Sequence, residues 1–321
     1  MSIHRIVTWQ ARIHIGRWTD PAAWKRSVEG KAREWLRHMP KRIRGLDMQA
    51  PAIRCWQTAG LLLGLTPADA SVWIQNNALL LGTAPLPEAA LLAYALKKRD
   101  ALSETDQNRI RARIIQSKGT LPYRPSCPEI RFVDTIGMIC PFLYAVGMDE
   151  WADRQIEEYD AGLYANTFPP HAYHLERELP LGVYDWGRGT GWYVLGLIES
   201  DRNEERILQL AERLLPLQKE DGSFGCFLFD PSSCPESSGS ALMGLLMVRA
   251  WELGGGDLFL SAAMKSEQSL MKMTRRDGTV DYAQGDTMGI GNYSRHFGIM
   301  PFAQGMTLLL ANRLASLFGT A

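Results

Sequence analysis

The chain has 321 residues, of which 35 are Lys or Arg and 35 are Asp or Glu, so its formal net charge is zero. This balance excludes the overall positive field that draws a protein to nucleic acid or to an anionic membrane, and it favours a small or neutral partner. No low-complexity segment or linker divides the sequence, which predicts one large domain over residues 1–321.

Location in the cell is also suggested by composition. The first residues mix Arg and His among apolar side chains and lack the apolar core of a secretory signal peptide. The most apolar stretch, 241–248, is far shorter than the roughly 20 residues needed to cross a bilayer. The five cysteines contain no CxxC pair and are odd in number, which is typical of reduced thiols. We therefore expect a cytoplasmic protein without a membrane segment and without a required disulfide.

Two kinds of helical segment alternate along the chain. Charged amphipathic segments predict outer helices near residues 22–38, 67–79, 104–118, 149–163, 202–218 and 256–274. Each precedes a segment that is apolar or small almost all round, and these segments begin near residues 54, 88, 134, 189, 238 and 301. A helix without a polar face must be buried on every side. Six inner and six outer helices predict an all-α fold, an (α/α)6 toroid.

Long loops rich in Gly, Pro and aromatic residues precede several of the inner segments. Long ordered loops are commonly functional, so we expect one end of the toroid to carry the site. Two stretches, DGSFGCFLFD at 221–230 and DGTVDY at 277–282, pair an Asp-Gly turn with strand-forming residues. They predict short β-hairpins at that end.

Asp134 stands where a polar loop enters a fully apolar helical segment. One interpretation is an N-cap, because an Asp side chain accepts hydrogen bonds from the free amides of a helix start. The other is a catalytic acid, because loss of water at the mouth of an apolar barrel raises the pKa of a carboxyl group. The residue alone does not decide between them.

The segment YDWGRGTGWY places Trp186, Arg188 and Trp192 among three glycines at the start of an inner helix. It is a poor phosphate loop, because no Lys follows the glycines. The indole rings offer stacking faces, the guanidinium offers a fork for a carboxylate, and the glycines allow close approach of a ligand. The alternative is helix packing, with Arg188 paired to a neighbouring acid.

The histidines and serines of the later loops carry weaker signals. His171, His174 and His296 suggest a metal site, but no carboxylate spacing supports one, and a polar contact to a ligand is the alternative. Ser237 and Ser238 precede an inner helix, where Ser is ordinarily a cap. No G-x-S-x-G elbow is present, so a catalytic serine is not predicted.

Several segments together resemble a known group of enzymes. FVDTIGMICPFLYAVG, GLYANTFPPHAY, WGRGTGWYVLGL, ESSGSAL and PFAQG occur in the order seen in glycoside hydrolase families 88 and 105. These are the unsaturated glucuronyl and unsaturated rhamnogalacturonyl hydrolases. The resemblance runs from about Glu88 to the carboxyl terminus, and its most specific part is V-D-T combined with W-G-R-G-x-G-W. It implies an (α/α)6 barrel, which agrees with the alternation of helices.

The resemblance also implies a reaction. The substrate would be a small oligosaccharide whose terminal uronic acid has a C4=C5 double bond, and Asp134 would take the place of the general acid and base. Asp134 would protonate C4 and then deprotonate the water that adds at C5, which departs from two-carboxylate glycoside hydrolysis. By the same resemblance, His171, Trp186, Arg188 and Trp192 would contact the substrate, and we add His296 as a polar contact. No metal or organic cofactor is implied.

One position departs from the pattern of these families. They usually carry a second aspartate at the start of the second inner helix, where this chain has Glu88. Glu88 would substitute with a longer reach, or it would only stabilise the first turn of the helix. If the second acid is missing, the chain is a carbohydrate-binding protein without turnover. A different toroidal enzyme, an isomerase or lyase, is the third alternative, and homodimerisation stays open.

Overall fold

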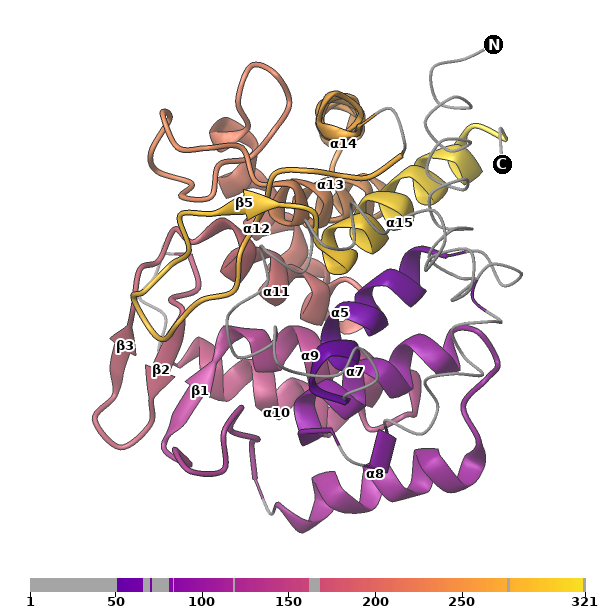
Figure 1. Ribbon diagram of the computed structural model, residues 1–321, viewed down its shortest axis with the longest axis vertical. Helices are drawn as coiled ribbons and strands as arrows, with labels where there is room; N and C mark the ends of the chain where they lie inside the picture. Colours follow the sequence, from indigo (N-terminus) through magenta and orange to yellow (C-terminus); the bar gives the residue numbers. More distant parts are fainter. Residues whose placement is uncertain are drawn as a thin grey trace.

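The computed structural model describes residues 51–65, 70, 81–82, 84–117, 119–161, 168–275 and 278–319 (Figure 1). Within these residues the α-helices are α5 (Pro51–Gly64), α7 (Leu86–Lys97), α8 (Glu104–Gln116), α9 (Val133–Ala145), α10 (Asp149–Asp160), α11 (Gly187–Leu197), α12 (Glu204–Leu214), α13 (Ser237–Glu252), α14 (Asp257–Met273) and α15 (Pro301–Leu317). Two short 3-10 helices, η2 (Asp201–Asn203) and η3 (Leu215–Leu217), flank α12.

Six helices form the inner ring of the toroid. In order around the ring, α5, α7, α9, α11, α13 and α15 each pack against the next, and α15 returns to α5. Figure 1 shows this closure, with the last helix in yellow beside the first in indigo. These are the six segments predicted as inner helices. They are buried almost all round, which is why their sequences lack a polar face.

The seam between α5 and α15 depends on glycine. A Cβ atom built on Gly305 would lie 1.9 Å from the carbonyl oxygen of Gly60, and one built on Gly64 would lie 2.1 Å from the carbonyl oxygen of Gly305. The two backbones therefore touch directly, and no side chain larger than hydrogen fits between them.

Four described helices lie outside the ring. α8 packs on α7, α10 on α9, α12 on α13 and α14 on α13. Figure 1 places α8 and α14 at opposite edges of the ring. α12 buries one face only, through Ile207, Leu210, Ala211 and Leu214. These four helices agree with the predicted outer segments. The segments at 22–38 and, apart from residue 70, 67–79 lie outside the described residues.

The strands are short and lie in the loops before inner helices. β1 (Ile130–Phe132), β2 (Ala172–His174) and β3 (Leu179–Leu181) form an antiparallel sheet in that order. β4 (Ala283–Gln284) pairs with β5 (Phe297–Gly298).

Short paired strands therefore exist, but they do not lie in the two stretches predicted to form hairpins. In 221–230 and the described part of 277–282 there are only isolated bridges, such as Trp186 with Phe227. The amide of Gly187 donates to the carbonyl of Cys226 at 2.9 Å, so the first stretch bonds to the start of α11 rather than to itself. The local alternation of residues could not reveal that distant partner.

No helix in the described part of the chain is both long enough and apolar enough to span a membrane.

Candidate functional site

The first turns of four inner helices meet the long loops at one end of the ring. They carry Glu88 on α7, Asp134 on α9, Arg188 on α11 and the serines at the start of α13. Strand β1 enters α9 directly, and the amide of Val133 donates to the carbonyl of His171 at 3.0 Å. The loop between α10 and α11 is thereby fixed beside the start of α9.

Asp134 is not the N-cap of its helix. Phe132 occupies that position and makes no side-chain capping bond, and Asp134 is the second residue of the helix, within its first turn. Its side chain is 20% exposed. Burial raises its pKa to about 7, and the carboxylate of Asp286 acts in the same direction, whereas its own backbone amide and Arg188 act against them. The Oδ2 atom is buried and accepts no hydrogen bond from any described residue. Such a carboxyl group can hold a proton near neutral pH and release it.

His171 lies next to this carboxyl group. Its Nε2 atom is 3.9 Å from Oδ2 of Asp134. Burial lowers the pKa of His171 to about 4, so the imidazole is neutral at physiological pH. The ring lies among aromatic neighbours, with centroids 4.6 Å from Trp186, 5.5 Å from Tyr293 and 5.7 Å from Phe132. A neutral, fixed imidazole is suited to hydrogen bonding rather than to charge pairing.

Glu88 supplies a second carboxyl group at the same end of the ring. Its side chain is buried, and its Oε1 atom accepts a hydrogen bond from the hydroxyl of Tyr123 at 3.3 Å. Burial, and then the carboxylates of Glu88, Asp134 and Asp286, raise the pKa of Tyr123 well above its usual value. Three acids therefore act on one phenol, which stays protonated and donates its hydrogen bond to Glu88.

Sequence reasoning missed Tyr123 and Asp286. Both lie in loops, and nothing in their immediate neighbours distinguishes them from other loop residues. The only available signal was their position in long loops ahead of inner helices.

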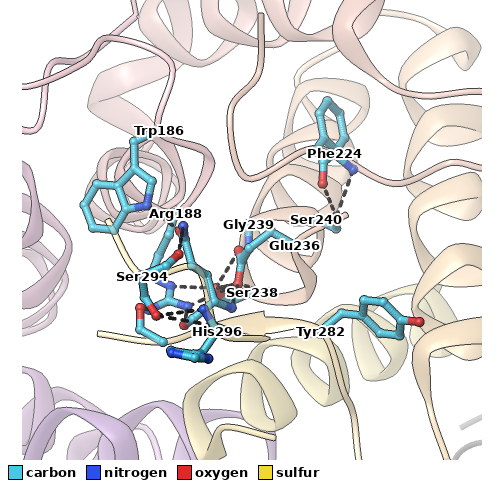
Figure 2. Close-up of polar contacts among 12 residues, drawn as sticks. Trp186, Arg188, Phe224, Glu236, Ser238, Gly239, Ser240, Tyr282, Ser294 and His296 are labelled. Atoms are coloured by element: carbon cyan, nitrogen blue, oxygen red, sulfur yellow. Dashed lines mark hydrogen bonds and ion pairs between the residues drawn. The ribbon is translucent and has the colours of Figure 1, made fainter. Parts of the chain in front are cut away.

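Arg188 is held within the protein. Its Nη2 atom pairs with Oε1 of Glu236 at 3.2 Å, and its Nε atom donates to Oγ of Ser238 at 3.1 Å (Figure 2). The guanidinium also donates to the carbonyl oxygens of Gln284 and Gly285. This arrangement matches the packing alternative, in which Arg188 pairs with a neighbouring acid. It ties α11, α13 and strand β4 together.

Glu236 completes that network and is the N-cap of α13. Its buried carboxylate accepts hydrogen bonds from the amide of Gly239 at 2.6 Å, the amide of Gln284 at 3.0 Å and the hydroxyl of Ser238 at 2.8 Å. The predicted serine cap is therefore wrong, because the longer Glu side chain folds back to take that role. The carboxylate is satisfied from several sides, as a buried charge must be.

The two tryptophans of the WGRGTGW segment differ in position. Trp186 precedes α11, donates from Nε1 to Oε1 of Gln284 at 2.9 Å and lies against His171. Trp192 is 1% exposed, and its ring packs 4.5 Å from Phe302 and 5.7 Å from Trp56. Trp192 thus lies in the aromatic core of the ring.

The three glycines of that segment allow close packing inside the protein. A Cβ atom on Gly187 would lie 2.4 Å from the carbonyl oxygen of Gly225, and one on Gly189 would lie 2.6 Å from the ring of Trp186. One on Gly191 would lie 2.8 Å from the side chain of Leu242. Their small size serves contacts with the protein itself, which is a different reason from the predicted approach to a ligand.

His296 has an exposed side chain, and among the described residues only its backbone is bonded, to Gly285 and Ser294. The structure therefore does not bring its imidazole into the contacts around Asp134. Over the described ranges, no group of three or more His, Cys, Asp or Glu side chains is arranged to hold a metal ion.

Comparison with known proteins links part of the chain to a known family. Residues 178–317 match the model of Glycosyl Hydrolase Family 88. An unsaturated 3S-rhamnoglycuronyl hydrolase from Alteromonas sp. (strain LOR) is 31% identical over 116 residues. That match covers 31% of this chain and 28% of the relative, so it spans less than a third of the relative's length.

Solved structures match over nearly the whole chain. A possible member of the GH105 family from Salmonella enterica serovar Paratyphi A is 15% identical, with a TM-score of 0.74 over 99% of this chain and 96% of that one. An unsaturated glucuronyl hydrolase specific for heparin is 13% identical, with a TM-score of 0.71 over 98% of each chain. These identities establish a shared fold and confirm the predicted toroid. Residues 178–317 thus resemble glycoside hydrolase family 88 in sequence, and the chain shares its toroid with a possible member of the GH105 family and with an unsaturated glucuronyl hydrolase.

Proposed function

We propose that this protein, acting as a single toroidal domain, is a glycoside hydrolase that removes a terminal 4,5-unsaturated uronic acid from an oligosaccharide. The names of its relatives support this substrate class. The observation that carries the proposal is the carboxyl group of Asp134, which has a pKa of about 7 and a buried Oδ2 atom that no described residue bonds.

In the first step, protonated Asp134 transfers its proton to C4 of the unsaturated uronate. The ring substrate is a vinyl ether, so protonation at C4 leaves positive charge at C5 that the ring oxygen shares. A pKa of about 7 keeps a large fraction of Asp134 protonated at neutral pH and still allows transfer. The neutral imidazole of His171 accepts or donates a hydrogen bond to the sugar at this stage without adding charge.

In the second step, the Asp134 carboxylate removes a proton from the water that adds at C5. The resulting hemiketal opens and releases the neighbouring sugar. Asp134 ends the cycle protonated, so one carboxyl group serves as both acid and base. Glu88 is the second carboxyl group of the site and orients that water or a sugar hydroxyl.

The other predicted residues take different parts in the proposal. Trp186 forms the aromatic wall beside His171, and Trp192 forms the floor of the ring. His296 contributes at the exposed rim. The ion pair with Glu236 supports a positioning role for Arg188, in place of the direct contact with a substrate carboxylate that the sequence suggested.

An absorbance assay tests the function. Purified protein is mixed with unsaturated glucuronyl and unsaturated galacturonyl-rhamnose disaccharides, and loss of the enuronate band is followed. We expect the band to disappear with wild type, and Asp134→Asn to lower the rate at least about 100-fold. Asp160→Asn is the matched control, because the pKa of Asp160 is also raised by burial but its carboxylate is bonded to Tyr193 and Arg206.

Each contrary result would favour a different function for this protein. Saturable sugar binding without turnover would favour the carbohydrate-binding alternative, and a product that retains the double bond would favour an isomerase or lyase. Full activity of Asp134→Asn would remove Asp134 from the chemistry.

A further inference from the structure

Two cysteines face each other in the loop between α12 and α13. Gly225 and Pro235 form an antiparallel bridge, and the amide of Cys226 donates to the carbonyl of Cys234 at 2.9 Å. One step along this pairing, Cys226 lies directly opposite Cys234. Directly opposed residues carry their side chains on the same face of the ribbon.

The spacing of such a pair suits a covalent link. Opposed residues of an antiparallel pair have Cα atoms about 4.5–5.5 Å apart, and a disulfide joins Cα atoms about 4.4–6.8 Å apart. The two segments also approach closely here, because a Cβ atom built on Gly225 would lie 2.0 Å from Oγ of Ser233. From these contacts we infer that Cys226 and Cys234 form a redox-active pair, which a small-molecule disulfide converts to an intramolecular disulfide bond.

The surroundings of the two thiols indicate which of them reacts first. Cys226 is 6% exposed, whereas Cys234 is half-buried and is reached first from solvent. Burial, and then the nearby Cys234 thiol, raise the pKa of Cys226. Burial also raises the pKa of Cys234, but the ammonium group of Lys219 opposes that rise. Cys234 is therefore the attacking thiol and Cys226 the resolving one.

The chemistry balances with the small disulfide as the only oxidant. The Cys234 thiolate attacks one sulfur of the small disulfide, and one small thiol leaves. The Cys226 thiolate then attacks the Cys234 sulfur of the mixed disulfide, and the second small thiol leaves. Two protein thiols are oxidised, one small disulfide is reduced to two thiols, and the two protons pass to those thiols.

A disulfide between Cys226 and Cys234 would affect the start of α11. The carbonyl of Cys226 receives the amide of Gly187, the first residue of α11, and Phe227 bridges to Trp186. A disulfide would therefore fasten the loop that holds the WGRGTGW segment in place. This inference does not depend on the proposed function, since it concerns thiols that the reaction does not use.

Mass spectrometry of the whole protein tests it. Reduced wild type is treated in its folded state with oxidised glutathione, its remaining thiols are alkylated under denaturing conditions, and it is digested with trypsin. Both cysteines fall in one peptide, residues 220–249. We expect this peptide to lose two hydrogens and to carry no alkyl group, while Cys127 is alkylated as in the untreated protein.

Single variants distinguish the order of attack. In Cys226→Ser, which lacks the resolving thiol, a glutathione adduct should persist on Cys234. In Cys234→Ser the peptide should keep one alkylated thiol. A persistent glutathione adduct on Cys234 of folded wild type, or alkylation of both cysteines after treatment, would overturn the inference. Circular dichroism before digestion confirms that each protein is folded.

Discussion

The Nε2 atom of His171 lies 3.9 Å from Oδ2 of Asp134, yet the two side chains do not form an ion pair at any pH. The pKa of His171 is about 4 and that of Asp134 is about 7. Below pH 4 the carboxyl group is protonated, and above pH 7 the imidazole is neutral. Burial sets both values, so both side chains are uncharged between about pH 4 and about pH 7.

Activity should fall as pH rises through about 7. Asp134 must be protonated to start the proposed reaction, and its carboxyl group loses that proton around its pKa of about 7. We expect kcat/KM on an unsaturated disaccharide to drop about tenfold for each further pH unit. A profile that stays flat from neutral to alkaline pH would contradict this assignment.

Stability should depend on Asp134 in the same sense as activity, because both fall as pH rises. Its carboxyl group has an ordinary pKa of 3.8, which folding raises to about 7. Between these values the unfolded chain releases the proton first, so the folded state loses stability as pH rises. Between about pH 5 and about pH 8 the loss is roughly 2 to 3 kcal/mol, and Asp134→Asn avoids it. Urea unfolding of both proteins at the two pH values measures the difference, which should be small at the lower pH.

The hydroxyl of Tyr123 should matter because it bonds to Glu88. Tyr123→Phe keeps the ring against Phe132 and removes only the donor. A hydrogen bond to a carboxylate contributes about 1.5 to 3 kcal/mol, so we expect kcat/KM to fall about tenfold or more. If the bond acts through Glu88, the same change in a Glu88→Gln background should cost much less.

Tyr144→Phe is the matched control for this experiment. Its hydroxyl also donates to a carboxylate, that of Asp153, but at the opposite end of α9. It should leave kcat/KM unchanged. Equal losses in both variants would indicate a general effect on folding.

The Arg188–Glu236 ion pair should be stabilising only as a pair. Both side chains are buried, so Glu236→Gln leaves the guanidinium without its counter-charge and should cost about 3 to 5 kcal/mol of folding free energy. Arg188→Met should cost a similar amount. Thermal and urea unfolding of the double variant should show a loss smaller than the sum of the two single losses. Additive losses would mean that the two groups act independently.

The glycine seam should not tolerate a methyl group. Gly305→Ala places a Cβ atom 1.9 Å from the carbonyl oxygen of Gly60, and relief requires α5 and α15 to separate. We expect a loss of at least about 3 kcal/mol in urea unfolding. Gly119→Ala is the control, because its Cβ atom would meet no atom within 4 Å and should leave stability almost unchanged.

The ring of inner helices could be predicted from sequence, because a helix that is buried on every side has no polar face in its sequence. An inner helix such as α13 is apolar or small on every face, and α12 is apolar on one face only. Asp134 was recognisable by its place between a loop and an apolar helix. These features depend on residues that are neighbours in the sequence, so the sequence alone reveals them.

The site contacts could not be predicted, because they join residues far apart in the chain. Trp186 pairs with Phe227, Arg188 bonds to Glu236, and Tyr123 bonds to Glu88. Each partner is a loop or helix-start residue whose own neighbours suggest a local role, such as a hairpin or a cap. Tertiary packing overrode those local preferences.

Closure of the ring also constrains how the chain can fold. The Nδ2 atom of Asn312 donates to the carbonyl of Gly64 at 3.0 Å across 248 positions of sequence, at the seam where α15 meets α5. Contacts of such separation form late, because a long loop must first be brought together. During synthesis, the apolar face of α5 that packs on α15 stays uncovered until α15 has left the ribosome. A chain cut before α15 would leave that surface open to chaperones and to aggregation.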